Sequence, residues 1–277
     1  MQHIEGEFRE NSNFNLYYQC WLPADLPRAA LLLVHGLAEH SGRYLNFANY
    51  FAGKGYAVYC FDQRGHGKSP GLRGYIDKFS DFVDDLDTFL EVIRNKHRNT
   101  KIFLIGHSLG GTISVAYGVL NQDKLNGLIL SGATLRAGAS ISSGIIILGR
   151  VLSLILPKIG LYTIDTSALS RDKTVVDTYV NDPLVYLGKV RIRLGIEILK
   201  IMRTLESQML GITLPILIMH GTADQLSDPK GSEILYNKVS SRDKTLKLYD
   251  GFYHEIFNEF GHARVFTDIE GWLTAHV

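Results

Sequence analysis

The sequence predicts an α/β fold with a mostly parallel central sheet, helices on both of its faces and an inserted helical cap. Short uninterrupted apolar runs, typical of strands buried on both faces, alternate with stretches of helical period. This alternation implies parallel strands joined by helical crossovers. It stops between residues 132 and 213, a stretch too long for a loop, and then resumes. We therefore expect a core of residues 1–134 and 206–277 and an inserted cap of residues 135–205.

The expected elements follow one another along the chain. Residues 5–10 and 15–22 look like an antiparallel pair joined by the turn Asn11-Ser12-Asn13. The further strands are expected at residues 29–34, 57–61, 102–105, 127–131, 214–221 and 245–249. The helices of the core are expected at residues 44–54, 79–96, 112–120, 229–237 and 263–275.

The turn after the strand at residues 102–105 contains the motif from which we infer a function. It reads Gly106-His107-Ser108-Leu109-Gly110, which fits the pattern G-x-S-x-G, and a helix follows it. A chain that turns from strand to helix in so few residues strains the turning residue, and the flanking glycines relieve the crowding. Ser108 is left exposed beside the positive end of the helix, so we interpret it as a nucleophile.

A serine hydroxyl is a weak nucleophile at neutral pH, so it needs a base and a group that orients the base. In a parallel sheet these groups lie in loops after the strands, at the same edge as the serine. Asp224 follows the expected strand 214–221, and His254 follows the expected strand 245–249. The chain order serine, aspartate, histidine is the one expected for this architecture, with His254 as base and Asp224 as orienting acid.

Other histidines and acids are weaker candidates. His262 is the main alternative to His254, but it lies well beyond the end of the last strand. Asp228 is the alternative acid, and because it precedes a proline we interpret it as a helix N-cap. His35 and His220 end strands, where we expect them to bond to nearby backbone.

An acyl-transfer site also needs donors for the negatively charged oxygen of the tetrahedral intermediate. Removing one such donor typically costs about 10²–10³-fold in rate. We expect one donor to be the backbone N–H of Leu109, the residue after the nucleophile. The other should come from the loop after strand 29–34, where Leu37 follows His35-Gly36. Leu37 and Leu109 are the predicted oxyanion-hole residues.

Charge and composition argue against several other classes. The formal net charge of the 277 residues is +1, which gives no reason to expect binding to nucleic acid. Cys20 and Cys60 lie in separate strand-like runs, so we expect two buried free thiols and no metal site. The first residues lack a signal-peptide pattern, and no apolar run reaches about 18 residues. We therefore expect a soluble, cytoplasmic protein.

The motifs together resemble those of the α/β-hydrolase superfamily and, within it, of the monoacylglycerol lipase family, also known as lysophospholipases. The resemblance covers nearly the whole chain. The segments that carry it are His35 to Tyr44, Phe61 to Ser69, Gly106 to Gly111, and those around Asp224 and Tyr253-His254. It implies the α/β-hydrolase fold and hydrolysis of a monoacylglycerol to glycerol and fatty acid through an acyl-enzyme, with no metal or cofactor.

The resemblance also implies a polar pocket for the glycerol head group near the oxyanion-hole loop. Arg43 and Tyr179 match positions that line this pocket, and His107 is a further substrate-binding candidate. Val175 stands where vertebrate members carry a glutamate that faces the pocket, with Asp177 close by. A lysophospholipase or a broad carboxylesterase is therefore an alternative, and a binding protein that has lost catalysis is a more distant one.

Residues 142–157 are the most apolar stretch of the chain and predict one helix, which Pro157 ends and from which Arg150 can reach water. A helix simply buried against the core would also fit this composition. We favour a helix that lines an acyl tunnel and touches a membrane surface with its outer side. The expected partners are a lipid ester substrate and, transiently, a membrane surface, which would make the cytoplasmic protein peripheral there.

Overall fold

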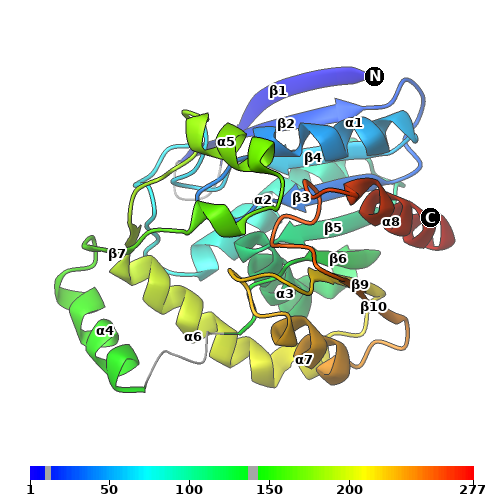
Figure 1. Cartoon of the computed structure of the whole chain (residues 1–277). Helices are drawn as coiled ribbons and strands as arrows, with labels where there is room; N and C mark the ends of the chain where they lie inside the picture. The colour runs from blue at the N-terminus through cyan, green and yellow to red at the C-terminus, as the bar shows by residue number, and fades with distance from the viewer. Residues whose placement is uncertain (10–13, 137–142) are drawn as a thin grey trace.

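The computed structural model describes residues 1–9, 14–136 and 143–277, and its centre is a twisted sheet (Figure 1). This sheet has eight strands in the order β1-β2-β4-β3-β5-β6-β9-β10. β2 pairs antiparallel with β1 and β4, and the other neighbours are parallel, so the predicted mostly parallel sheet is confirmed. The strands are β1 (Gln2–Arg9), β2 (Asn15–Leu22), β3 (Ala30–Val34), β4 (Ala57–Phe61), β5 (Ile102–His107), β6 (Gly127–Ser131), β9 (Ile216–Gly221) and β10 (Lys244–Tyr249).

Helices cover both faces of the sheet, as the alternation of elements predicts. Along β3, Leu31 and Leu33 pack into one apolar cluster with α1 and α8, whereas Leu32 and Val34 pack into another with α2, α3, α6 and α7. This alternation is the two-residue period of a strand buried on both faces. The helices are α1 (Leu45–Gly53), α2 (Ser80–Lys96), α3 (Leu109–Asn121), α6 (Ile192–Gln208), α7 (Lys230–Lys238) and α8 (His262–His276).

The interruption of the α/β pattern corresponds to the segment between β6 and β9. The apolar residues of its last helix, α6, join the cluster that contains α3. The expected boundary between residues 205 and 206 falls within the last turn of α6, and the division into core and cap remains a prediction. The other elements of the segment are α4 (Ser143–Ile155), β7 (Gly160–Tyr162), η3 (Thr166–Ala168), α5 (Lys173–Asn181), β8 (Val190–Arg191) and η4 (Met209–Gly211). Two short 3₁₀ helices lie elsewhere, η1 (Ser41–Tyr44) and η2 (Gln122–Lys124).

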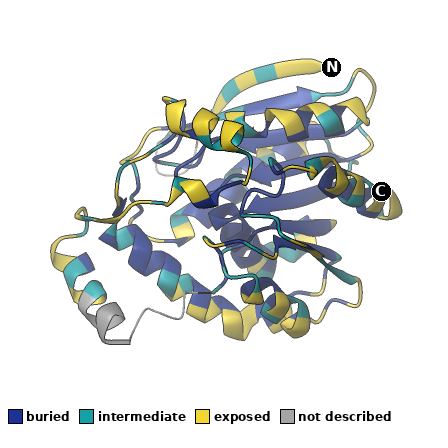
Figure 2. Ribbon diagram, viewed as in Figure 1, coloured by how far each residue is buried: buried dark blue, intermediate teal, exposed yellow. Residues whose placement is uncertain are grey.

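Helix α4 corresponds to the apolar stretch predicted at residues 142–157. Residue 142 and the turn predicted at residues 11–13 lie outside the described part of the chain. Helix α4 ends before Pro157 and packs against α6, with Gly149 facing Ile196. Its last turn is exposed, with Leu154 and Ile155 at 74% and 69% exposure, whereas the central strands of the sheet are buried (Figure 2). In Figure 1, α4 lies far from the sheet at the edge of the molecule.

The two thiols are buried and free, as predicted. Cys20 and Cys60 belong to the apolar clusters on opposite faces of the sheet, so their side chains point away from each other. None of the helices in the described ranges is both long and apolar enough to cross a membrane.

The turn from β5 to α3 is tighter than the sequence suggests, because Ser108 alone separates the two elements. Ser108 has a φ of +53°, in the left-handed region that only glycine adopts without strain. The close approach of neighbouring segments explains the flanking glycines. A methyl group on Gly110 would overlap the carbonyl oxygen of Val34, and one on Gly106 would overlap Ser114.

Substituting these glycines should therefore destabilise the fold. We expect Gly110→Ala to lower the free energy of unfolding by at least about 2 kcal/mol, because the overlap is with the backbone of β3, which cannot rotate away. Gly271→Ala in α8 is the matched control, since open space surrounds that position, and helix propensity should make it stabilising by about 0.5–1 kcal/mol. Urea denaturation of both variants checks this, and equal midpoints would contradict it.

Candidate active site

A cavity of about 470 Å³ opens at the carboxyl ends of the central strands, and Ser108 lies on its wall. The cavity is mostly apolar, with lining side chains from α6 and from the segment around β7. The apolar residues include Leu161, Ile164, Leu169, Ile198, Leu199, Met202 and Leu226. A cavity of this kind, with a few polar groups converging on one point, suits an apolar ligand held in a fixed orientation.

The structure brings Ser108, Asp224 and His254 together from three separate loops. His254 Nδ1 lies 2.7 Å from Asp224 Oδ2, so Nδ1 donates to the carboxylate and Nε2 is the nitrogen left to act as a base. Ser108 and His254 both line the cavity. The structure thus pairs the predicted base with the predicted orienting acid and places the predicted nucleophile on the same cavity wall as the base, while the Ser108 hydroxyl itself contacts Thr134.

The pKa values of the acid and the base move apart, as their roles require. Burial alone would raise the pKa of Asp224, but His254 and the hydrogen bonds that the carboxylate accepts lower it overall. Burial alone would lower the pKa of His254, but the Asp224 carboxylate raises it overall. Asp224 is therefore an anion at neutral pH and stabilises a positive charge on His254.

A chain of hydroxyl groups accompanies the nucleophile. Ser108 Oγ lies 3.3 Å from Thr134 Oγ1, which in turn lies 2.7 Å from Ser227 Oγ. The backbone N–H of Ser227 donates to Asp224 Oδ1 over 2.9 Å. The loop after β6 thus connects the nucleophile to the loop that carries the acid, and sequence patterns alone do not predict Thr134 or Ser227.

The two predicted oxyanion-hole residues line the same cavity as Ser108. Leu109 is the first residue of α3, and Leu37 follows β3; both line the cavity beside Ser108. The loop of Leu37 is held by Glu39, whose Oε1 accepts the N–H of Gly36 over 2.6 Å. Ala38 in the same loop has a φ of +68°, so the backbone there is strained, as is common at functional sites.

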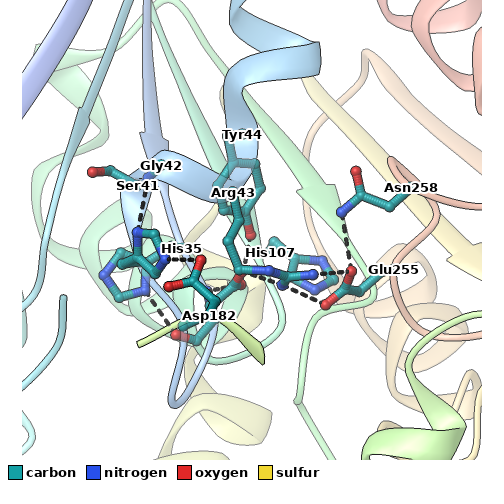
Figure 3. A network of polar contacts seen from close by, with 12 residues as sticks. His35, Ser41, Gly42, Arg43, Tyr44, His107, Asp182, Glu255 and Asn258 are labelled. Atoms are coloured by element: carbon teal, nitrogen blue, oxygen red, sulfur yellow. Dashed lines mark hydrogen bonds and ion pairs between the residues drawn. The ribbon is translucent and has the colours of Figure 1, made fainter. Parts of the chain in front are cut away.

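Arg43 occupies a buried ion-pair network beneath this loop (Figure 3). Its Nη1 lies 2.8 Å from Glu39 Oε2, and its guanidinium contacts both oxygens of Glu255 at 2.6 and 2.8 Å. The Tyr179 ring covers the guanidinium with its centroid 4.5 Å away. Among the described residues that line the cavity are Glu39, Glu255 and Tyr179, but not Arg43.

The other residues predicted to bind substrate are also placed. His107 lines the cavity, with its ring 4.8 Å from that of His254 and its Nδ1 3.0 Å from the Ser131 carbonyl oxygen. Burial and the neighbouring His254 lower the pKa of His107 to about 4, so it is neutral at physiological pH. Val175 lies on α5 beside a separate surface hollow, so its side chain is not part of the cavity wall.

His220 was predicted to bond to nearby backbone, and in the structure it also bonds to side chains. Its Nε2 lies 3.1 Å from the Ser227 carbonyl oxygen, but also 3.0 Å from Asp224 Oδ2. Its Nδ1 lies 2.7 Å from Ser232 Oγ on α7. Asp224 Oδ2 therefore contacts two imidazoles. The alternative acid, Asp228, accepts the N–H of Lys230 but lies one residue before Pro229, the N-cap of α7, and not at the N-cap itself as predicted.

Comparisons with known proteins identify the family of this chain. The family described as "Serine aminopeptidase, S33" matches residues 25–260. A monoacylglycerol lipase of Mycolicibacterium smegmatis is 34% identical over 273 residues, covering 99% of this chain and 98% of that protein. Crystal structures of a Paleococcus ferrophilus monoacylglycerol lipase and of a soluble Saccharomyces cerevisiae monoglyceride lipase variant with a substrate analog have TM-scores of 0.84 and 0.89. The first is 32% identical, and the match covers all of both chains. The second is 26% identical, and the match covers all of this chain and 96% of the other.

The fold and the site thus define a hydrolase of the α/β class. The chain belongs to the serine aminopeptidase S33 family of α/β-hydrolases and, within it, to the monoacylglycerol lipases. The family resemblance in its sequence motifs is confirmed.

A pH–rate profile on a soluble nitrophenyl ester tests the assignment of His254. The imidazole must be neutral to accept the serine proton, so kcat/KM should fall as the pH drops through the pKa of His254. Because Asp224 raises that pKa, the acid limb should lie above the ordinary imidazole value of 6.5. Asp224→Asn should move the limb to lower pH and reduce kcat by about 10⁴-fold, as in other triads. An acid limb well below 6.5 in the unaltered enzyme would contradict this assignment.

Proposed function

We propose that this protein is a serine hydrolase that cleaves the ester bond of monoacylglycerols, releasing fatty acid and glycerol. Ser108 Oγ attacks the ester carbonyl while His254 Nε2 takes its proton, and the N–H groups of Leu37 and Leu109 stabilise the oxyanion. His254 then gives the proton to the departing glycerol oxygen, leaving an acyl-enzyme. Water, activated by the same imidazole, hydrolyses the acyl-enzyme and restores Ser108.

One observation carries this proposal: the serine in a strained turn lines a largely apolar cavity that is also lined by an imidazole held by a buried carboxylate. The apolar lining suits an acyl chain, since each buried methylene is worth about 0.8 kcal/mol. Full-length similarity to monoacylglycerol lipases supports the same substrate class. The roles given to individual residues are part of the proposal.

Labelling with a serine-directed phosphonate tests the nucleophile. Ser108→Ala should abolish stoichiometric labelling and reduce monoacylglycerol hydrolysis by at least about 10⁴-fold. Ser114→Ala is the control, because it removes another buried serine hydroxyl from α3, one that has no hydrogen-bond partner among the described residues. This control should retain labelling and turnover. Undiminished hydrolysis by Ser108→Ala would refute the mechanism.

We further propose that residues 135–205 act as a cap that admits substrate from a membrane surface. The support is a group of exposed apolar side chains on and after α4, which includes Leu154, Ile155, Ile159 and Leu161. Leu161 and Tyr162 are exposed and also line the cavity, so this apolar surface continues into the site. A lipid tail could therefore pass from a bilayer to Ser108 without crossing water.

Charging the outer side of α4 should weaken this contact. Because burying a leucine is worth about 1.5–3 kcal/mol, the double variant Leu154→Lys, Ile155→Lys should lose tenfold or more of its activity on long-chain monoacylglycerol in vesicles. Its activity on a short soluble ester should stay within about twofold. Leu120→Lys is the control: Leu120 is 68% exposed but lies near the end of α3 opposite Ser108. An equal loss on both substrates would count against the cap proposal.

A further inference from the structure

The charged residues near Ser108 are arranged in a way that the motifs do not predict. Arg43 was expected on the wall of the head-group pocket, yet its guanidinium lies behind two carboxylates that do line the cavity, those of Glu39 and Glu255. We call Glu39 and Glu255 the acidic wall. Arg136 also lines the cavity, but it is already paired with Asp228 at 2.8 Å.

The acidic wall keeps a net negative charge despite its arginine. Burial favours the neutral form of Glu255, but the adjacent guanidinium lowers its pKa to about 2, so the carboxylate is ionised at neutral pH. Glu39 accepts hydrogen bonds from Arg43 Nη1, from the Gly36 N–H and from Tyr44 Oη, which are all donors, as an ionised carboxylate requires. Two carboxylates share one guanidinium, which leaves a charge of about −1.

This wall offers hydrogen-bond acceptors. Ionised carboxylates only accept, and each oxygen has two lone pairs. The hydroxyl groups of glycerol can donate to the lone pairs that protein donors leave unoccupied. A phosphate ester carries up to two negative charges and only acceptor oxygens at neutral pH, so it would face like charges without a donor between them.

We propose that Glu39 and Glu255 determine head-group specificity, admitting a neutral hydroxylated head group such as glycerol and excluding an anionic phosphate ester. This inference rests on the proposed function, because it concerns the same cavity and the same ester. The proposed specificity separates two substrates with the same acyl chain: the monoacylglycerol, and the anionic lysophospholipid that carries a phosphate on its glycerol.

The test compares 1-octanoylglycerol with 1-octanoylglycerol 3-phosphate, both as dissolved monomers, by the release of octanoate. We expect kcat/KM for the phosphate to be lower by about 100-fold. One negative charge of the protein about 6 Å from the phosphate would lower kcat/KM by about this factor, if the effective dielectric constant is about 20. The short chain removes any difference in how the two compounds enter a membrane.

A pair of variants assigns the selectivity to the wall. Glu255→Gln removes one negative charge and keeps an oxygen that can accept from Arg43, so the preference should shrink from about 100-fold to about tenfold or less. Asp177→Asn removes the same charge from an exposed position on α5 and should leave the ratio unchanged. The ratio is the readout, because a general loss of activity lowers both rates together. Near-UV circular dichroism and phosphonate labelling check that each variant is folded.

The outcomes separate the two proposals. If the unaltered enzyme hydrolyses both compounds equally, or the phosphate faster, the proposed function stands and the acidic-wall proposal is wrong. An unchanged ratio in folded Glu255→Gln also overturns it. If neither compound is hydrolysed while a nitrophenyl ester is, the monoacylglycerol function fails and the acidic-wall proposal falls with it. If Glu255→Gln does not fold, the comparison in the unaltered enzyme still decides.

Discussion

The ion pairs of Arg43 hold together the two loops between which an ester must react. On one side Arg43 contacts Glu39, which also binds the N–H of Gly36 in the loop after β3. On the other side it contacts both oxygens of Glu255, the residue that follows His254. Losing one partner of a buried ion pair costs about 3–5 kcal/mol, because the other charge stays buried without compensation. The loop proposed to form the oxyanion hole and the loop of the proposed base are therefore held at a fixed separation, as preorganised catalysis requires.

The inserted segment rests on the same loops. The ring of Tyr179 on α5 lies over the guanidinium of Arg43, and Asp182 contacts His40 at 2.9 Å. The N–H of Tyr186 also donates to the carbonyl oxygen of Ala38, the strained residue beside Leu37. Anchoring at α5 contrasts with the last turn of α4, where Leu154 and Ile155 are exposed. The part of the segment next to Arg43 is thus tied to the core by specific contacts.

Local patterns account for what the sequence could predict, and long-range contacts account for what it could not. The turn at Ser108 and the buried strands have signatures within a few adjacent residues, so their positions could be read directly. The second contact of Asp224, with His220, depends on how the loop after β9 folds back on its own strand. Glu255 pairs with Arg43 across 212 positions of sequence, and no short motif encodes such a contact. Arg43 was expected to line the head-group pocket from motif position alone, and motif position cannot reveal that its guanidinium is paired with two carboxylates.

The polarity of the cavity provides an orientation as well as an affinity. Each methylene of an acyl chain buried in an apolar cavity gains about 0.8 kcal/mol. Summed over a dozen methylenes, this gain is far larger than the net gain of one head-group hydrogen bond, which is about 0.5–1.5 kcal/mol. Affinity must therefore come mainly from the acyl chain, to which the wall formed by α6 and β7 is complementary. The carboxylates of Glu39 and Glu255 repel that chain, because burying apolar groups against them would remove their remaining hydration. An amphiphile can satisfy both ends of the cavity in one direction only, and that direction carries its ester past Ser108.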